Sequence, residues 1–468
     1  MVFALLLAAL ALAVAFGGLG DGGSDDDVII GTDGDDTLEG GEGDDRINGE
    51  AGNDLIDGAG GDDTLEGGEG NDWLDGGPGI NQVAGGAGDD TVQLSDGFED
   101  HSYRDDNGAF VRDQSHLSGG DGTDLLDASG MTESVDVMLD AGNQGFVVGG
   151  EQFDHFVQID GFERFALGSG DDLAFLIDTG ADIEIDTGAG GDIVTLIADG
   201  AHTVRGGSGD DHIIAVDPGG AAGFAPGLTL DGGSGDETRG DWLDIASDRN
   251  TIVTIDDSGS GTATVRSATV EFSNFERFST GSGDDLIDAS ATTTGVFVDS
   301  GTGQDTVIGG SGNDTLIGDS VIGGAGDDEL VGNYADGGEG NDVVHAEDAY
   351  GGAGNDTVSG DTMTGGEGID HFEANTDVTD GMGPTQAETI TDFEPGETVE
   401  LTIRYNTVDT NDPGITHPEP TYSVEEDTTT HQVRVVVNGE TALIINGIDS
   451  LPPGSLHVTI SGYDPWTN

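Results

Sequence analysis

Residues 31–93 read GTDGDDTLE-GGEGDDRIN-GEAGNDLID-GAGGDDTLE-GGEGNDWLD-GGPGINQVA-GGAGDDTVQ, which is seven consecutive nonapeptides. The eighth position of every copy is aliphatic, and the sixth is Asp in every copy except one, where it is Asn81. We interpret each copy as six residues of glycine-rich turn followed by three residues of strand. One inward aliphatic side chain per strand cannot form a core alone, so the repeats must stack on one another.

Two further kinds of repeat follow. The segment Phe162-Glu163-Arg164-Phe165 recurs at residues 275–278, and both copies follow a glycine-rich loop and an alternating strand pattern, which indicates a duplicated module. We expect the paired segments to be duplicated core packing. From residue 309 the loops recur every 14 residues, with one apolar residue in each loop's strand and one in each spacer. This spacing predicts coils with a glycine loop on one side, a tight turn on the other and a thin shared core.

The two ends of the chain differ from the repeats. Residues 2–16 are an unbroken apolar run, for which a membrane anchor and a cleaved export signal are equally good interpretations. Residues 433–437 and 442–445 predict two strands of a hairpin with Asn438-Gly439 near its turn. The fold class we expect is all-β, a parallel β-roll or β-solenoid with a small C-terminal antiparallel β cap. The predicted organisation is an apolar segment (1–20), an acidic linker (21–30), a first roll (31–94), an insert (95–118), two module copies (119–231 and 232–308), a period-14 roll (309–373) and the cap (374–468).

The composition limits what the chain can bind. Ninety-five acidic residues stand against 11 arginines and no lysine, for a formal net charge of −84. This charge excludes electrostatic binding to nucleic acid or to an anionic membrane surface. Apolar residues are only 34 % of the chain, and cysteine is absent. Such a chain is either disordered or folded with the help of bound cations.

The glycine loops have the chemistry of a hard-cation site. The strict hexapeptide Gly-Gly-x-Gly-x-Asp occurs ten times, beginning at residues 40, 67, 85, 119, 206, 309, 323, 337, 351 and 365. Glycine allows positive φ and lets backbone carbonyls turn inward, and the sixth-position Asp supplies a carboxylate. Oxygens from two stacked loops suit Ca²⁺, which accepts 6–8 flexible oxygen ligands, whereas Mg²⁺ demands a tighter octahedron. Transition metals would favour imidazole or thiolate, and no His occupies the recurrent position.

The motif resembles the RTX (haemolysin-type) calcium-binding repeat, Gly-Gly-x-Gly-x-Asp-x-aliphatic-x, over residues 31–373 with interruptions. The resemblance implies a parallel β-roll that holds several structural Ca²⁺ ions between loops two repeats apart. It places Asp36, Asp54, Asp72 and Asp90 on one side of the first roll and Asp45, Asp63 and, imperfectly, Asn81 on the other. The metal ligands that it implies are Asp36, Asp45, Asp54, Asp63, Asp72, Asp90, Asp124, Asp172, Asp192, Asp211, Asp285, Asp305, Asp314, Asp328, Asp342, Asp356 and Asp370.

Some loops depart from the motif. The repeat GGPGIN at residue 76 should hold a weak or empty site, and Thr32, Glu50 and Ala59 replace the second glycine. At Gly232 the sixth position is Glu237, followed by an insertion before Asp241, so no ligand is assigned there. The Asp or Asn at the fifth position (Asp35, Asp44, Asn53) is interpreted as surface charge.

No catalytic motif is present. The chain contains neither His-Glu-x-x-His nor Gly-x-Ser-x-Gly, which the peptidases and lipases that carry such repeats would require. The insert contains His101, Tyr103, Arg104, Arg112 and His116, for which a surface loop is the favoured interpretation and a glycan-binding or acid–base site the alternative.

We therefore expect a non-enzymatic, exported surface or matrix protein whose rolls fold on binding extracellular Ca²⁺. Its partners would be calcium ions and extracellular polysaccharide or cell-surface components, without nucleic acid. It would meet a membrane only through the N-terminal segment. By the resemblance, residues 374–468 could hold an export signal. The alternative is a calcium-stabilised polysaccharide-modifying enzyme in residues 119–308, which clustered Asp, His and Arg on one exposed face would favour.

Overall fold

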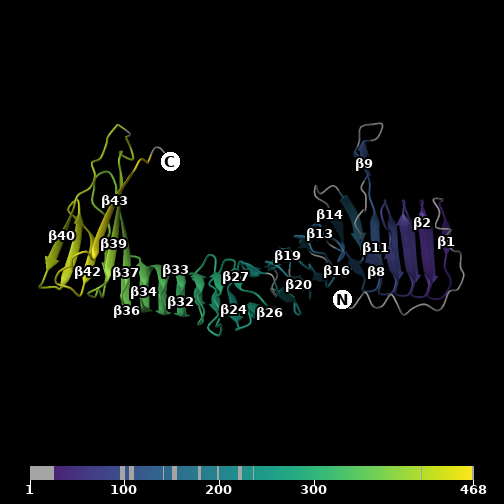
Figure 1. Ribbon diagram of the computed structural model, residues 1–468, viewed down its shortest axis with the longest axis horizontal. Coiled ribbons are helices and arrows are strands. Elements are labelled where there is room, and N and C mark those ends of the chain that lie inside the picture. Colours follow the sequence, from purple (N-terminus) through teal and green to yellow (C-terminus); the bar gives the residue numbers. More distant parts are fainter. Residues whose placement is uncertain are drawn as a thin grey trace. The chain divides into compact units, whose positions relative to one another are not determined.

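The computed structural model describes residues 26–94, 101–104, 110–140, 142–149, 155–177, 181–197, 200–219, 224–235, 237–412 and 414–465. Within these residues the chain forms strands and no helix (Figure 1). It divides into two compact units, Met1–Leu243 with Val270–Asn274, and Asp244–Thr269 with Phe275–Asn468. The apolar segment 1–20 lies outside the described residues, and no described helix is long and apolar enough to cross a membrane.

The first roll is built from short parallel strands that pair two nonapeptides apart. Leu38 pairs with Ile56 and Ile47 with Leu65, so alternate repeats contribute to opposite sides of the roll. The eighth-position aliphatics from Leu38 to Val92 are at most 5 % exposed and form the core. The strands are β1 (Val28–Ile30), β2 (Thr37–Glu42), β3 (Arg46–Ala51), β4 (Leu55–Gly60), β5 (Thr64–Glu69), β6 (Trp73–Asp75), β7 (Gln82–Ala87) and β8 (Thr91–Gln93).

The insert forms an antiparallel hairpin of β9 (His101–Arg104) and β10 (Phe110–Asp113). After it, β11 (His116–Asp121) and β12 (Leu125–Asp127) pair in parallel with β7 and β8, so the roll continues beyond the insert.

The duplicated region repeats one packing arrangement. Phe162 and Phe165 meet edge to face with centroids 6.4 Å apart, and Phe275 and Phe278 do the same at 6.5 Å. All four rings are at most 2 % exposed, which confirms the expectation of duplicated core packing.

Antiparallel excursions interrupt the coils of this region: β13 (Val135–Asp140) pairs with β14 (Gln144–Gly149), which pairs with β15 (His155–Asp160), and β24 (Thr251–Ile255) pairs with β25 (Gly261–Val265). The other strands are β16 (Arg164–Ala166), β17 (Leu173–Leu176), β18 (Glu184–Asp186), β19 (Ile193–Ile197), β20 (Thr203–Gly207), β21 (His212–Val216), β22 (Thr229–Gly233), β23 (Trp242–Ala246), β26 (Ala268–Ser273), β27 (Arg277–Thr280), β28 (Leu286–Asp288), β29 (Phe297–Asp299) and β30 (Thr306–Ile308).

The period-14 block has the two-strand coils that the spacing predicts. Leu330 pairs with Val344 and Ala335 with Ala349, one residue on each side of a thin core. All of these residues are at most 1 % exposed. The strands, drawn in green in Figure 1, are β31 (Thr315–Ile317), β32 (Ser320–Ala325), β33 (Glu329–Glu339), β34 (Val343–Gly354), β35 (Thr357–Ser359), β36 (Thr362–Gly368) and β37 (His371–Val378).

The C-terminal cap combines antiparallel and parallel pairing. The predicted hairpin is confirmed, because β41 (Gln432–Val437) and β42 (Glu440–Asn446) pair antiparallel. Asn438 and Gly439 both have positive φ, 52° and 91°, as a type I′ turn requires. The strand β40 (Tyr422–Asp427) joins this hairpin. Parallel pairs extend the roll into the cap, through β38 (Glu388–Ile390) on β42 and β39 (Thr398–Asn406) between β37 and β43 (Leu456–Tyr463).

Candidate metal sites in the glycine loops

The sixth-position aspartates form ladders between successive loops on the same side. One carboxylate oxygen, Oδ1, accepts a hydrogen bond from the backbone N–H of the equivalent residue in the preceding loop, at 2.8–2.9 Å. The ladders run Asp36-Asp54-Asp72-Asp90-Asp124, Asp45-Asp63-Asn81, Asp172-Asp192-Asp211-Asp241, Asp285-Asp305 and Asp314-Asp328-Asp342-Asp356-Asp370.

The other oxygen, Oδ2, turns into the loop, where backbone carbonyls converge on it. A Cβ built on Gly67 would collide with both Oδ2 of Asp72 and the carbonyl oxygen of Gly85. One built on Gly70, where φ is 128°, would collide with the carbonyl oxygen of Gly52. The loops therefore need glycine at these positions, and they bring carboxylate and carbonyl oxygens from stacked loops together. An all-oxygen donor set of this kind fits Ca²⁺.

These carboxylates are buried without a counter-charge. The seventeen predicted aspartates are at most 8 % exposed, and none makes an ion pair within the described residues. In fourteen of them Oδ2 accepts no hydrogen bond; they are Asp45, Asp54, Asp63, Asp72, Asp90, Asp124, Asp172, Asp192, Asp211, Asp285, Asp328, Asp342, Asp356 and Asp370. Charged side chains are almost never buried to this extent unless they are paired or bind a metal.

Burial raises the pKa of most of these groups. The pKa is raised to about 6 for Asp54, Asp90, Asp124, Asp192 and Asp342, and to about 7 for Asp63, Asp172, Asp211, Asp328 and Asp356. Desolvation is the largest cause, and neighbouring carboxylates add to it. Without a cation, ionisation of the loops is therefore opposed by burial and by like charge.

In three of the predicted aspartates, the second carboxylate oxygen accepts a hydrogen bond from the protein. Thr32 N–H donates to Asp36, Gly310 N–H donates to Asp314 at 2.9 Å, and Ser300 Oγ donates to Asp305 at 3.1 Å. Ser300 stands where the motif has its first glycine. These three carboxylates have less need of a cation than the other fourteen.

Asn81 differs from the ladder aspartates because its side chain ends in an amide rather than a carboxylate. Its Oδ1 accepts from Asp63 N–H at 2.9 Å, as an aspartate would. Its Nδ2 donates to the carbonyl oxygen of Gly77 at 2.8 Å, in place of the free oxygen found elsewhere. An amide N–H₂ group repels a cation, which is the physical reason to expect a weak or empty site in this loop.

Asp241 occupies a ladder position to which the sequence analysis assigned no ligand. Its Oδ1 accepts from Asp211 N–H at 2.9 Å, and the residue is 1 % exposed. The four extra residues before it fold outward over Asp210, which accepts hydrogen bonds from Thr238, Arg239 and Gly240. The triplet Asp241-Trp242-Leu243 matches Asp72-Trp73-Leu74, a signal that could have identified the position.

Replacement of the second glycine by Glu50 or Ala59 does not disrupt the loops. Glu50 and Ala59 keep positive φ, 76° and 67°, close to the left-handed region that an L-residue can enter. The fifth-position residues are exposed, but they are not only surface charge. Oδ1 of Asp35 accepts from Asn53 N–H and that of Asp44 from Asp62 N–H, so they form a second, outer ladder.

The side chains of residues 101–113 lie outside what the structure describes, which includes His101, Tyr103, Arg104 and Arg112 of the insert. Of the singled-out insert residues only His116 is described. Its Nε2 lies 3.4 Å from Asp160 Oδ1, a half-exposed pair on adjacent strands.

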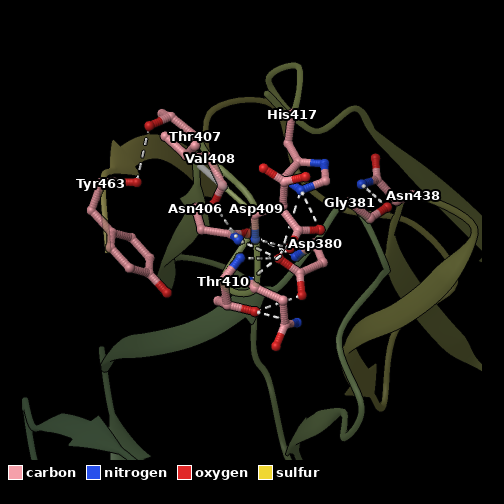
Figure 2. A network of polar contacts seen from close by, with 12 residues as sticks. Asp380, Gly381, Asn406, Thr407, Val408, Asp409, Thr410, His417, Asn438 and Tyr463 are labelled. Atoms are coloured by element: carbon pink, nitrogen blue, oxygen red, sulfur yellow. Dashed lines mark hydrogen bonds and ion pairs between the residues drawn. The ribbon is translucent and has the colours of Figure 1, made fainter. Parts of the chain in front are cut away.

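A mixed cluster in the cap contains two carboxylates and an imidazole. Figure 2 shows Asp380, Asp409 and His417, with His417 Nε2 3.6 Å from Asp380 Oδ1 and 3.7 Å from Asp409 Oδ2. Asp380 already accepts from Asn406 Nδ2, Thr410 N–H and Thr410 Oγ1, and these hydrogen bonds lower its pKa. Its oxygens are satisfied by protein donors, so we interpret the cluster as a network that closes the loops and assign no metal to it.

Comparison with known proteins identifies the repeats. The model of the RTX calcium-binding nonapeptide repeat matches four segments, residues 21–56, 57–92, 297–320 and 346–372. Among solved structures, the solution structure of the AlgE6R3 subunit from the Azotobacter vinelandii mannuronan C5-epimerase is 26 % identical. That match covers 32 % of this chain and 78 % of that one, with a TM-score of 0.18. No curated protein matches the chain.

Proposed function

Because the chain carries RTX calcium-binding nonapeptide repeats, we propose that it is an exported, non-enzymatic surface or matrix protein whose rolls fold on binding Ca²⁺. Calcium is its structural cofactor. The aspartates of the ladders are the carboxylate ligands, with Asp241 added to the predicted seventeen. Its partners are extracellular polysaccharide or cell-surface components.

The observation that carries the proposal is the set of buried carboxylate oxygens that accept no hydrogen bond. Each would be ionised in an unfolded chain at neutral pH, so folding without a cation requires either dehydrating the charge or protonating it. A cation between two loops removes this cost and attracts the converging carbonyls. The free energy of calcium binding then becomes free energy of folding.

The export part of the proposal follows from calcium concentration. Extracellular calcium modules commonly bind at about 10⁻⁴–10⁻³ M. A chain with a net charge of −84 and sites of that affinity would stay unfolded at cytosolic calcium and fold outside the cell.

The exposed charged side chains of the duplicated region support a non-enzymatic role over the alternative of a polysaccharide-modifying enzyme. Glu184 lies between Arg205 Nη1 at 2.6 Å and Arg164 Nε at 3.4 Å. The hydrogen bond from Arg205 lowers the pKa of Glu184, whereas a general acid needs a raised pKa. We therefore interpret these three side chains as ion pairs between coils rather than as a site for acid catalysis on a polysaccharide.

Far-UV circular dichroism of the full chain tests the proposal. The chain is placed in chelator and titrated with Ca²⁺ and, separately, with Mg²⁺. We expect a cooperative gain of β signal with Ca²⁺ and little with Mg²⁺. A chain that is already folded in chelator, or that is indifferent to Ca²⁺, would overturn the proposal.

A further inference from the structure

Beyond the end of the period-14 ladder, a glutamate lies in register with Asp370, where a further repeat would place an aspartate. His371 pairs with Thr357 in one direction and with Thr398 in the other, so Glu397 lies opposite Asp370 as Asp370 lies opposite Asp356. The backbone bonds repeat as well, since Thr398 N–H donates to the Asp370 carbonyl just as His371 N–H donates to that of Asp356. Residues 392–397 read DFEPGE and lack the glycine hexapeptide.

This last loop gathers three carboxylates around buried oxygens. Asp370 is 1 % exposed and its Oδ2 accepts no hydrogen bond, while Glu397 is 2 % exposed. Glu397 Oε2 accepts from Glu394 N–H at 2.6 Å. Asp392 accepts from the N–H groups of Gly365 and Gly366 at 3.0 Å each. No Arg or His pairs with Asp370, Asp392 or Glu397 in the described part of the chain.

The first unit also has a glutamate at the end of a ladder, with a different set of hydrogen bonds. The register of Leu125 with Arg164 places Glu163 opposite Asp124. Asp124 N–H donates to Glu163 Oε2 at 3.1 Å, the bond that Asp90 N–H makes to Asp124 Oδ1 at 2.8 Å. Asn143 Nδ2 donates to Glu163 Oε1 at 3.1 Å, so both oxygens of this glutamate are satisfied by the protein. Asp124 is fully buried and its Oδ2 accepts no hydrogen bond. The carbonyl oxygen of Gly161 lies against Gly119 as that of Gly85 lies against Gly67.

We propose that Glu397 is a cation ligand that closes the last site of the period-14 loop stack, supplying from a non-repeat loop the carboxylate that a further repeat would have supplied. The site is completed by the free oxygen of Asp370. The loop of Glu397 has Pro395 where the motif has its third glycine. The inference rests on the proposed function, because the cation is the same Ca²⁺.

Calcium counting by flow dialysis with radioactive Ca²⁺ on the full chain tests the inference. We expect Glu397→Gln to lose one bound ion, or to weaken one site at least tenfold. Glu394→Gln, an exposed change three residues away, should leave the count unchanged. In Ca²⁺ the melting temperature of Glu397→Gln should fall and should depend less steeply on the Ca²⁺ concentration, because one ion fewer is released on unfolding. Loss of a merely structural contact would lower the melting temperature without changing that dependence.

Several outcomes would separate the inference from the proposed function. If the natural chain binds Ca²⁺ and Glu397→Gln binds as many ions as tightly, the inference fails and the proposed function stands. If the natural chain binds no Ca²⁺, the proposed function fails with it. Should Glu397→Gln fold poorly, Glu397→Asp retains the carboxylate and is expected to keep more of the calcium affinity. Equal loss in both variants would overturn the inference.

Discussion

At the scale of single residues, each ladder aspartate performs two tasks with two oxygens. Oδ1 accepts the amide of the preceding loop and Oδ2 is left for a cation. The register of glycine, aspartate and aliphatic residue in the sequence was enough to predict which aspartates are buried. It was not enough for Asp241, because four inserted residues break the spacing, or for Glu397, because a different residue type in a loop without the motif takes the position.

Substitution of one ladder aspartate by asparagine separates the two tasks. Asp342→Asn keeps an oxygen for the amide of Asp328 but places an N–H₂ group where the free oxygen lies, as Asn81 does. We expect one site to weaken at least tenfold, which corresponds to about 1.4 kcal/mol. The measurement is the calcium count together with the melting temperature in Ca²⁺. Asp327→Asn makes the same chemical change at an exposed fifth position and should alter neither.

The reverse change should create a site. Asn81→Asp replaces the N–H₂ group that donates to Gly77 by an oxygen, in a loop whose neighbours carry Asp63 and Asp45. We expect at least one additional bound ion by flow dialysis and a higher melting temperature in Ca²⁺. An unchanged calcium count would show that Pro78 or Ile80, rather than Asn81, limits this loop.

At the scale of elements, the predictable part is the coil and the less predictable part is what interrupts it. A 14-residue period with two apolar positions per coil predicts strands of the β33 and β34 kind, because the side-chain alternation of a strand must place both residues inward. The sequence also carries an alternating pattern over β13–β15 and β24–β25. Its antiparallel pairing depends on contacts that no periodicity encodes, and the same holds for the parallel pairing of β39 and β43 within the cap.

The thin core of the period-14 block makes each aliphatic residue important. Leu330 is fully buried, whereas its neighbour Val331 is 39 % exposed. We expect Leu330→Ala to reduce the free energy of unfolding in saturating Ca²⁺ by about 2–5 kcal/mol, the usual cost of a large-to-small core change. Urea denaturation followed by circular dichroism measures it. Val331→Ala, on the same strand but facing outward, should cost far less. Similar losses for both variants would contradict the assigned core.

At the scale of the whole molecule, the excess of acidic residues means that folding depends on how their negative charge is neutralised. Composition alone predicts that the chain needs cations, since 11 arginines cannot balance 95 carboxylates. The structure adds that many of these carboxylates are buried in the ladders, where their pKa is raised. Protons and calcium ions are therefore alternative ways of neutralising the same groups, and stability must depend on both.

The sign of this dependence follows from the pKa values. In the folded chain without calcium, burial raises the pKa of Asp63 and Asp328 to about 7, from an ordinary value of 3.8. Between about pH 4 and pH 7 the folded chain therefore binds more protons than the unfolded chain. In chelator the fold should gain stability as the pH falls through this window and lose it as the pH rises toward 7.

The stabilisation that calcium provides should depend on pH in the opposite sense to the stability in chelator. A ladder carboxylate must lose its proton to bind Ca²⁺, so calcium affinity should fall as the pH is lowered from about 7 toward 5. Circular dichroism melts at pH 5 and pH 7.5, each in chelator and in Ca²⁺, measure both effects. We expect the chain in chelator to show more β structure at pH 5, and the gain of β signal on adding Ca²⁺ to be larger at pH 7.5. A gain that is equal at both values would mean that the ladder carboxylates do not exchange protons for calcium, because only that exchange couples the two.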